Sequence, residues 1–249
     1  MMNYKHKDSL NGLGRKVAIV TGASRGIGQS IAVSLALRGY SIAAIARSAG
    51  GLAETEARVL KAISDENIEI ATFEADLQDP SAVEEVFNAV RTRFGGASVL
   101  VNNAGYVDPV GLLETTLENW NKTLATNLTA TMLCTQRFVL WNKSLGGKII
   151  NIASTAGMSA RPGWSAYAAA KAGLINFSLT MSEELKPYDI KVYCVCPGRT
   201  ATQLREKLAP NEDQSTILQP NAVGNLVATL CSASGDFIDQ QPIVIRKPL

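Results

Sequence analysis

Short apolar runs alternate with amphipathic stretches along most of the chain. The apolar runs are rich in Val, Ile and Ala and lie at residues 16–21, 41–46, 68–73, 98–102, 148–152, 190–196 and 242–245. Continuous apolar runs of this length are typical of strands that are buried on both faces of a sheet. Helical periodicity between them predicts helices at residues 26–38, 52–64, 81–94, 117–140, 164–185 and 221–231, with a short helix at 202–208.

This alternation predicts the architecture. Strands that are separated by helices form parallel sheets with right-handed crossovers. We therefore expect a single-domain, doubly wound (Rossmann) seven-stranded parallel sheet with helices on both faces, whose ligands bind beyond the carboxyl ends of the strands. The chain has no linker or internal repeat, so we expect residues 13–249 to form one domain behind a flexible N-terminal tail, residues 1–12.

Composition and charge exclude several classes of function. The 249 residues are 46% hydrophobic and 18% charged, and the formal net charge is only +2. This charge does not favour a nucleic acid or an anionic membrane as a partner. No apolar stretch is long enough to span a membrane and the polar N-terminus is not a secretory signal, so we expect a cytoplasmic protein.

The reactive residue types narrow the chemistry further. The only histidine is His6, in the predicted tail, which argues against a Ser-His-Asp hydrolase and a histidine-based zinc site. Cys134, Cys194, Cys196 and Cys231 form no C-x-x-C pair, and we expect them to be buried and reduced. We expect no metal site.

A glycine-rich turn follows the first predicted strand and opens the first predicted helix. Its sequence is TGASRGIG, residues 21–28. Glycines in such a turn let the backbone approach a pyrophosphate, and the helix N-terminus supplies amide donors and a positive dipole. The turn therefore predicts a dinucleotide site, with Gly22, Ser24, Arg25, Gly26, Ile27 and Gly28 as binding residues.

Tyr167 and Lys171 are four positions apart in a predicted helix, so they share one face. An ammonium at that distance favours phenolate, and we expect it to lower the tyrosine pKa. A phenol of this kind suits the proton transfer of a carbonyl/alcohol interconversion. Ser154, thirteen residues upstream, completes a candidate catalytic group.

Taken together, these motifs resemble those of the short-chain dehydrogenase/reductase family, over nearly the whole chain. Besides the glycine turn, they are the pair Asp76 and Leu77, the NNAG segment that includes Asn103, Ala104 and Gly105, Asn127 in the long helix, the Ser154, Tyr167 and Lys171 trio, and Pro197, Gly198 and Thr200. In the family the Asp-Leu pair contacts adenine, the NNAG segment lines the cofactor, and the Pro-Gly segment surrounds the nicotinamide amide.

The resemblance also implies catalytic roles. Tyr167 would be the general acid in reduction and the base in oxidation. Lys171 would lower the tyrosine pKa and bind the nicotinamide ribose, and Ser154 would stabilise the developing alkoxide. Asn127 would hold a water that connects Lys171 to solvent. Family members also form homodimers or homotetramers, which we expect here.

The residues after the second strand favour NADP(H) over NAD(H). NAD-specific sites place a carboxylate there for the ribose 2′-hydroxyl, whereas this chain has Arg47 and Ser48. An arginine and a hydroxyl suit a 2′-phosphate, which Arg25 would approach from the glycine turn.

The substrate side is less specific. Residues 106–113, 156–164 and 199–220 should surround the nicotinamide, with Val107, Met158, Trp164 and Leu204 as an apolar lining and Arg161 as a cation near it.

The leading hypothesis is an oxidoreductase for small ketones or secondary alcohols. A 3-oxoacyl reductase whose partner is an acyl carrier protein, and a non-catalytic dinucleotide-binding regulator, stay open as alternatives. A nucleotide-sugar epimerase or dehydratase would need a larger substrate domain and a different glycine spacing.

Overall fold

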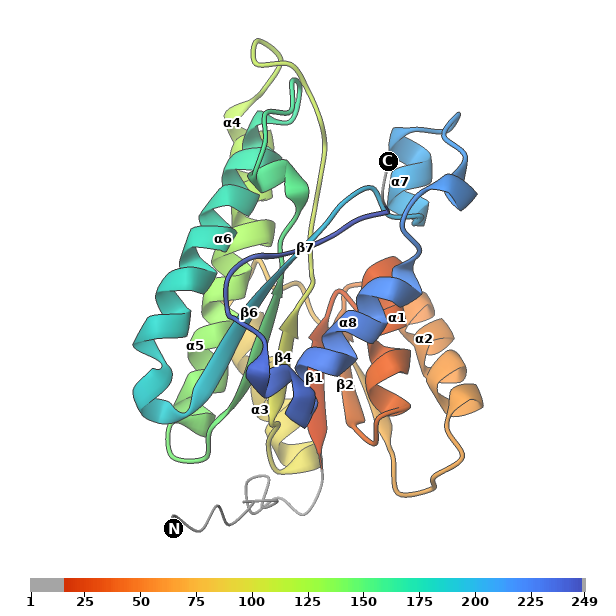
Figure 1. Ribbon diagram of the computed structural model, residues 1–249, viewed down its shortest axis with the longest axis vertical. Helices are drawn as coiled ribbons and strands as arrows, with labels where there is room; N and C mark the ends of the chain where they lie inside the picture. The colour runs from red at the N-terminus through yellow and green to blue at the C-terminus, as the bar shows by residue number, and fades with distance from the viewer. Residues whose placement is uncertain (1–15, 248–249) are drawn as a thin grey trace.

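The computed structural model describes residues 16–247, and the predicted tail, residues 1–12, lies outside them. One seven-stranded sheet runs through the molecule in the order β3-β2-β1-β4-β5-β6-β7, with every neighbouring pair parallel (Figure 1). Its strands are β1 (Val17–Thr21), β2 (Ser41–Ala46), β3 (Ile70–Glu74), β4 (Val99–Asn102), β5 (Gly147–Ile152), β6 (Ile190–Pro197) and β7 (Ile243–Ile245). The predicted fold class is confirmed.

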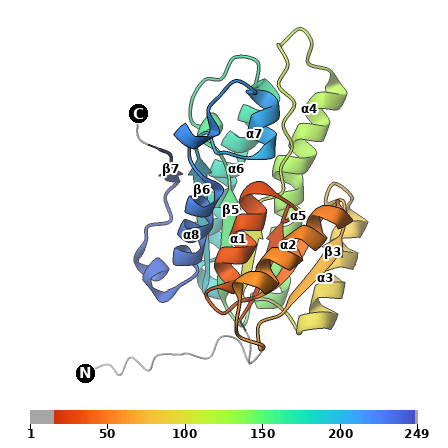
Figure 2. The ribbon, with the colours of Figure 1, turned by 90° about the vertical axis from the view of Figure 1, so that its right-hand side faces the viewer.

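The helices form one layer on each face of the sheet (Figures 1 and 2). Helices α1 (Gly26–Ala36), α2 (Ala49–Ala62) and α8 (Pro220–Leu230) pack together on one face. The other face carries α3 (Pro80–Phe94), α4 (Leu117–Leu124), α5 (Ala130–Asn142) and α6 (Ser165–Glu184). The short helix α7 (Gln203–Leu208) stands apart from both layers, beyond the carboxyl ends of the strands.

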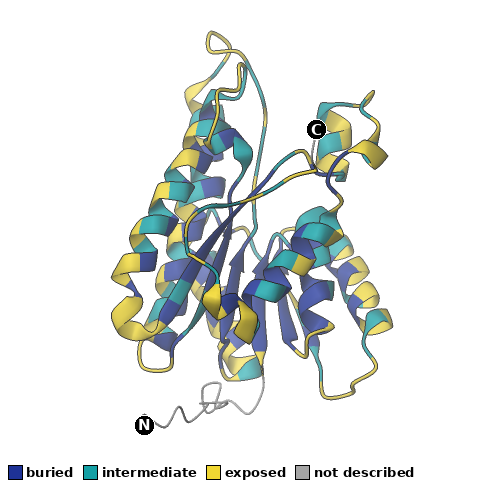
Figure 3. Ribbon diagram, in the orientation of Figure 1, coloured by how far each residue is buried: buried dark blue, intermediate teal, exposed yellow. Residues whose placement is uncertain are grey.

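Burial on both faces explains the continuous apolar runs. Every residue of β1 and β2 is buried, and Figure 3 shows the strands as the buried centre of the molecule. Alternate residues of β1 serve different layers: Ala18 and Val20 pack in the cluster under α1 and α8, while Val17 and Ile19 pack in the cluster under α3 and α5. The four cysteines are buried free thiols, as expected.

The predicted elements are present, with ends that differ by a few residues. Helix α2 begins earlier than expected because Ser48 caps it, accepting a hydrogen bond from the Gly51 amide at 3.3 Å. The long helix expected over residues 117–140 is interrupted by a π-helical turn at Ala125–Thr129, which separates α4 from α5. Among residues 16–247, no helix has both the length and the apolar character that crossing a membrane requires.

Candidate active site

A cleft of about 540 Å³ opens beyond the carboxyl ends of the strands, where the chain order reverses between β1 and β4. All the residues predicted to bind the cofactor line it: Gly22, Ser24, Arg25, Gly26, Ile27, Gly28, Arg47, Ser48, Asp76, Leu77, Asn103, Ala104, Gly105, Tyr167, Lys171, Pro197, Gly198 and Thr200. Ser154 lines the same cleft, so the topology brings together motifs that are far apart in the sequence.

The turn between β1 and α1 is fixed to the end of β4. The hydroxyl oxygen of Thr21 accepts hydrogen bonds from the amides of Asn103 and Ala104, at 2.9 and 3.0 Å. In return, the side-chain amide of Asn103 donates to the carbonyls of Thr21 and Gly22, at 3.0 and 3.1 Å. These hydrogen bonds hold the glycine turn and the NNAG segment in a fixed position relative to each other. Thr21 was not among the predicted site residues, although its hydroxyl at the strand end was visible in the sequence.

The N-terminus of α1 is built to accept an anion. Gly22 and Gly26 have φ angles of +62° and +57°, which side chains other than glycine rarely adopt. Arg25, the N-cap residue, makes no side-chain capping bond, and the first turn has no acidic residue. The first amides of the helix and its positive dipole therefore face the cleft without an internal partner, which fits a dinucleotide pyrophosphate.

Arg47 and Ser48 directly follow β2, which lies on the opposite side of β1 from β5 and Ser154. A guanidinium nitrogen of Arg47 is 3.8 Å from a carboxylate oxygen of Asp76, and both side chains are about half exposed. This pair is weak, so Arg47 keeps most of its donors free. The Ser48 hydroxyl accepts from Gly51, which leaves its own proton for a ligand.

Ser154, Tyr167 and Lys171 come from two adjacent segments. Ser154 follows β5 and begins a 3-10 turn, Thr155–Gly157, by accepting a hydrogen bond from the Ala156 amide at 3.1 Å. Tyr167 and Lys171 lie one turn apart in α6. Lys171 is 3% exposed, and its ammonium donates to the Ile152 carbonyl at 2.9 Å. Tyr167 is partly buried, with the ring of Trp164 edge-on at 5.7 Å.

The expected lowering of the Tyr167 pKa is wrong. Burial raises the pKa of Tyr167 to about 12, although a hydrogen bond with Ser154 lowers it in part. Burial also lowers the pKa of Lys171 to about 8. The ammonium is directed to the Ile152 carbonyl and lies 5.7 Å from the centre of the tyrosine ring, so desolvation outweighs its attraction for phenolate. The phenol is therefore protonated at neutral pH.

Asn127 does not line the cleft, unlike its neighbour Thr126. It is fully buried in the π-helical turn. Its amide donates to the carbonyls of Tyr106 and Thr123, at 2.7 and 2.9 Å, and its oxygen accepts from the Tyr106 amide at 3.3 Å. Both amide hydrogens are thus used within the protein. The side chain fixes the segment after the NNAG motif, and it has no donor left for the expected relay water.

The substrate side of the cleft is formed mostly by the residues expected. Val107, Trp164 and Leu204 line it, and Arg161 lines it without an ion pair to another residue in the range 16–247. Met158 is the exception. It is 51% exposed and lies outside the cleft lining.

Two glycines that the sequence did not identify support the site. A Cβ at Gly157 would lie 2.6 Å from the carbonyl carbon of Lys171, so only glycine lets the turn after Ser154 pack against α6 there. A Cβ at Gly51 would lie 2.8 Å from Cβ of Ser24, so glycine also lets α2 approach the glycine turn. Neither glycine belongs to a recognisable motif, and each follows only from the packing.

A doubly wound sheet with a glycine turn at its reversal point defines a dinucleotide-binding class of protein. The comparison with protein families is more specific: a model of the short chain dehydrogenase family matches residues 16–213. The chain belongs to the short-chain dehydrogenase/reductase family and is an oxidoreductase acting on CH–OH or C=O groups.

Similar proteins support this assignment. The chain is 38% identical to a 3-oxoacyl-[acyl-carrier-protein] reductase of Synechocystis over 200 residues, 80% of each chain. It is 34% identical to the corresponding reductase of Escherichia coli, over 93% of this chain and 96% of that one. Among solved structures, an actinorhodin polyketide ketoreductase with NADPH has a TM-score of 0.85 and 28% identity, over 94% of this chain and 96% of the other.

Proposed function

We propose that the chain is an NADP(H)-dependent oxidoreductase that interconverts a ketone and a secondary alcohol at Ser154, Tyr167 and Lys171. One observation carries the proposal. These three side chains line the same cleft as the glycine turn, so a proton donor faces the space that a dinucleotide would enter. A bound nicotinamide would supply the hydride chemistry, and the protein would position the substrate and manage its proton.

The residues of the cleft fit such a cofactor from end to end. The free amides at the start of α1 suit the pyrophosphate, and Lys171 is placed to bind the nicotinamide ribose. Arg25, Arg47 and Ser48 suit a 2′-phosphate better than a bare 2′-hydroxyl, which supports NADP(H) over NAD(H). Two similar structures also contain this kind of cofactor, one NADPH and one 5-hydroxy-NADP.

Tyr167 is suited to donate a proton to the substrate oxygen. Its pKa of about 12 keeps the phenol protonated at neutral pH, which is the state that reduction requires. Ser154 would hydrogen-bond the same oxygen as negative charge develops there. Lys171 would act beside them as a buried cation.

A 3-oxoacyl group on an acyl carrier protein is the second candidate substrate. The names of the Synechocystis and Escherichia coli relatives favour it. The surface around the end of α6 does not add to this case, because the charge of Lys186 is balanced by that of Glu183, 2.5 Å away. We therefore put the small ketone first and the carrier-bound thioester second.

The test is cofactor oxidation by purified protein with a panel of diketones, ketoesters and 3-oxoacyl thioesters, each with NADPH and with NADH. Tyr167→Phe should reduce kcat at least about 100-fold and leave NADPH affinity nearly unchanged. Tyr188→Phe removes an exposed phenol outside the cleft and should behave as wild type. Tight NADPH binding without turnover of any carbonyl would favour the non-catalytic regulator, and a Tyr167→Phe variant above a tenth of wild-type kcat would contradict the assigned acid.

A further inference from the structure

The segment after Gly198 folds back on itself to form a small lid, residues 199–218. Its two ends are joined by backbone hydrogen bonds: the Leu218 amide donates to the Arg199 carbonyl at 3.1 Å, and the Ala201 amide donates to the Leu218 carbonyl at 2.8 Å. Thr200 and Leu218 therefore pair as a parallel bridge. The lid is a closed loop whose base is anchored beside the end of β6.

Helix α7 forms one wall of the cleft from within this lid. Gln203, Leu204, Arg205 and Leu208 all line the cleft, as does the N-cap residue Thr202. The helix has only six residues and buries none of them. Helices this short are unstable without tertiary support, so another contact has to hold α7 in place.

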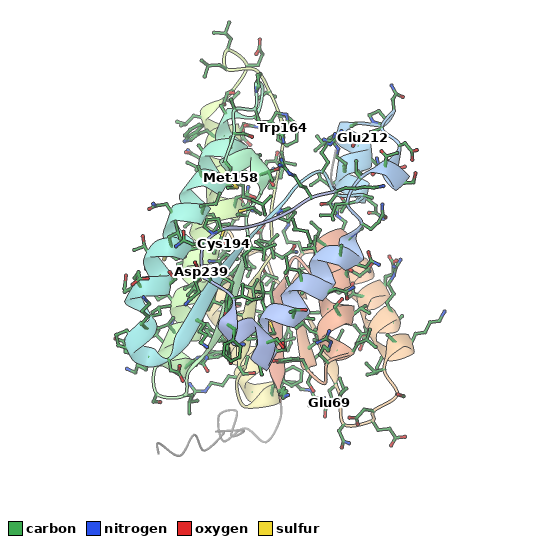
Figure 4. The ribbon with its side chains drawn as sticks, viewed as in Figure 1. Glu69, Met158, Trp164, Cys194, Glu212 and Asp239 are labelled. Carbon is green, nitrogen blue, oxygen red and sulfur yellow. The ribbon has the colours of Figure 1, made fainter. Side chains whose placement is uncertain are left out.

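Glu212 supplies that contact from the chain just beyond α7 (Figure 4). Its carboxylate accepts from Nε and Nη2 of Arg205, at 2.5 and 2.9 Å, and from Nη1 of Arg199, at 2.7 Å. The carboxylate side chain is 14% exposed, and the Arg205 hydrogen bond lowers its pKa. A bidentate pair with a second arginine ties the helix, the loop after it and the base of the lid together.

Glu212 lies outside the cleft and would not contact a ligand there. It is not among the residues that line the cleft, whereas Arg199 and Arg205 are. Thr202, at the start of α7, lies over the glycine turn: its methyl carbon would be 3.1 Å from a Cβ at Gly26. A contact that fixes α7 therefore also fixes the surface that faces the cofactor turn.

We propose that Glu212 is a positioning residue that holds α7 in its binding-competent place before any ligand arrives. Ordering this wall in advance removes part of the conformational entropy that cofactor binding would otherwise lose. The consequence for affinity rests on the proposed NADP(H) function. The ordering of α7 itself does not.

Glu212→Gln tests the proposal, because it removes the charge and keeps the size of the side chain. Glu206→Gln is the matched control: Glu206 is exposed, lies in α7 itself and makes no ion pair with another residue in the range 16–247. Hydrogen exchange of the ligand-free proteins is measured for peptides that cover residues 203–209, whose amides include Glu206 and Ala209, bonded to Thr202 and Arg205 carbonyls. NADPH affinity and kcat are measured on the same proteins.

We expect exchange of these peptides to be at least about tenfold faster in Glu212→Gln than in Glu206→Gln, and the NADPH Kd to rise about tenfold. At saturating NADPH, exchange should return to the wild-type rate and kcat should stay within about twofold. Equal exchange in the two variants, faster exchange throughout the sheet, an unchanged Kd or a proportionate loss of kcat would each overturn the proposal. Wild-type protein that binds neither NADPH nor NADH would refute the proposed function, and the ligand-free exchange would still decide whether Glu212 orders α7.

Discussion

Lys171→Met should make the protein more stable while abolishing its turnover. The ammonium of Lys171 is 3% exposed and has one hydrogen-bond partner, the Ile152 carbonyl, and no ion pair within residues 16–247. A buried charge with so little compensation destabilises the folded state. Methionine has a similar unbranched shape and no charge, so it fits the same space with little repacking.

The magnitude follows from the pKa of the lysine. Burial lowers it from the ordinary 10.5 to about 8. At 1.36 kcal/mol per pKa unit, this difference corresponds to roughly 3 kcal/mol of stability that the protonated lysine costs the folded state near pH 7. The variant leaves the Ile152 carbonyl without its donor, which costs about 1–2 kcal/mol. We therefore expect a net gain of about 1–2 kcal/mol, or a rise in Tm of roughly 4 °C for a chain of this length.

Denaturant unfolding of both proteins at several pH values between 7 and 10.5 gives the measurement. The folded-state pKa is depressed, so across this window the unfolded wild-type chain binds more protons than the folded one, and wild-type stability rises with pH relative to the variant. The advantage of Lys171→Met should therefore shrink above about pH 8, vanish near about pH 9 and reverse by about pH 10, where the neutral lysine keeps the hydrogen bond that methionine lacks. Lys143→Met, at an exposed lysine, should show no such trend. A variant less stable than wild type at pH 7, or a difference that does not change with pH, would refute the reasoning.

The geometry of the cleft predicts the effects of two substitutions and of pH. Arg47→Ala should weaken NADPH about tenfold or more and leave NADH nearly unchanged, as titration of both cofactors would show; equal losses would remove the 2′-phosphate argument. Gly28→Ala would place a Cβ 2.2 Å from the Gly22 carbonyl oxygen and should cost about 1–3 kcal/mol in unfolding experiments, whereas Gly50→Ala, with no atom within 4 Å, should cost nothing. The kcat of ketone reduction should fall above about pH 8 as Lys171 loses its proton, and a pH–rate profile that stays flat to pH 10 would contradict this.

Much of the architecture was predictable because the local sequence pattern of each element matches its burial in the fold. Strands such as β1 and β2 are buried on both faces, so their sequences are apolar throughout and stand out against the amphipathic helices. Most of the residues that line the cleft were equally visible, since a parallel sheet places the ends of its strands at one edge and most of the motifs follow a strand.

The pKa shift of Tyr167 and the hydrogen-bond partners of buried side chains could not be predicted, because they depend on distances between residues that are far apart in the sequence. The i,i+4 spacing of Tyr167 and Lys171 is correct, but the sign of the tyrosine pKa shift depends on desolvation and on the Ile152 carbonyl that receives the ammonium. The side-chain partners of Asn127 were hidden in the same way, because Tyr106 and Thr123 take both of its amide hydrogens, and the relay water stays a prediction that would use an oxygen of Asn127. Contacts like these join residues that no local pattern connects.

The fold indicates the class of reaction more firmly than the substrate, because the two depend on different parts of the cleft. The glycine turn, β4 and the β5–α6 segment are tied to a buried sheet by hydrogen bonds, which leaves these segments little freedom. The substrate wall instead consists of exposed loops and α7, which buries none of its own residues. Selectivity among ketones should therefore respond to changes in residues 199–218 that leave the chemistry of Tyr167 intact. Because Glu212 joins Arg199 and Arg205, its replacement should affect the base of this segment and α7 together.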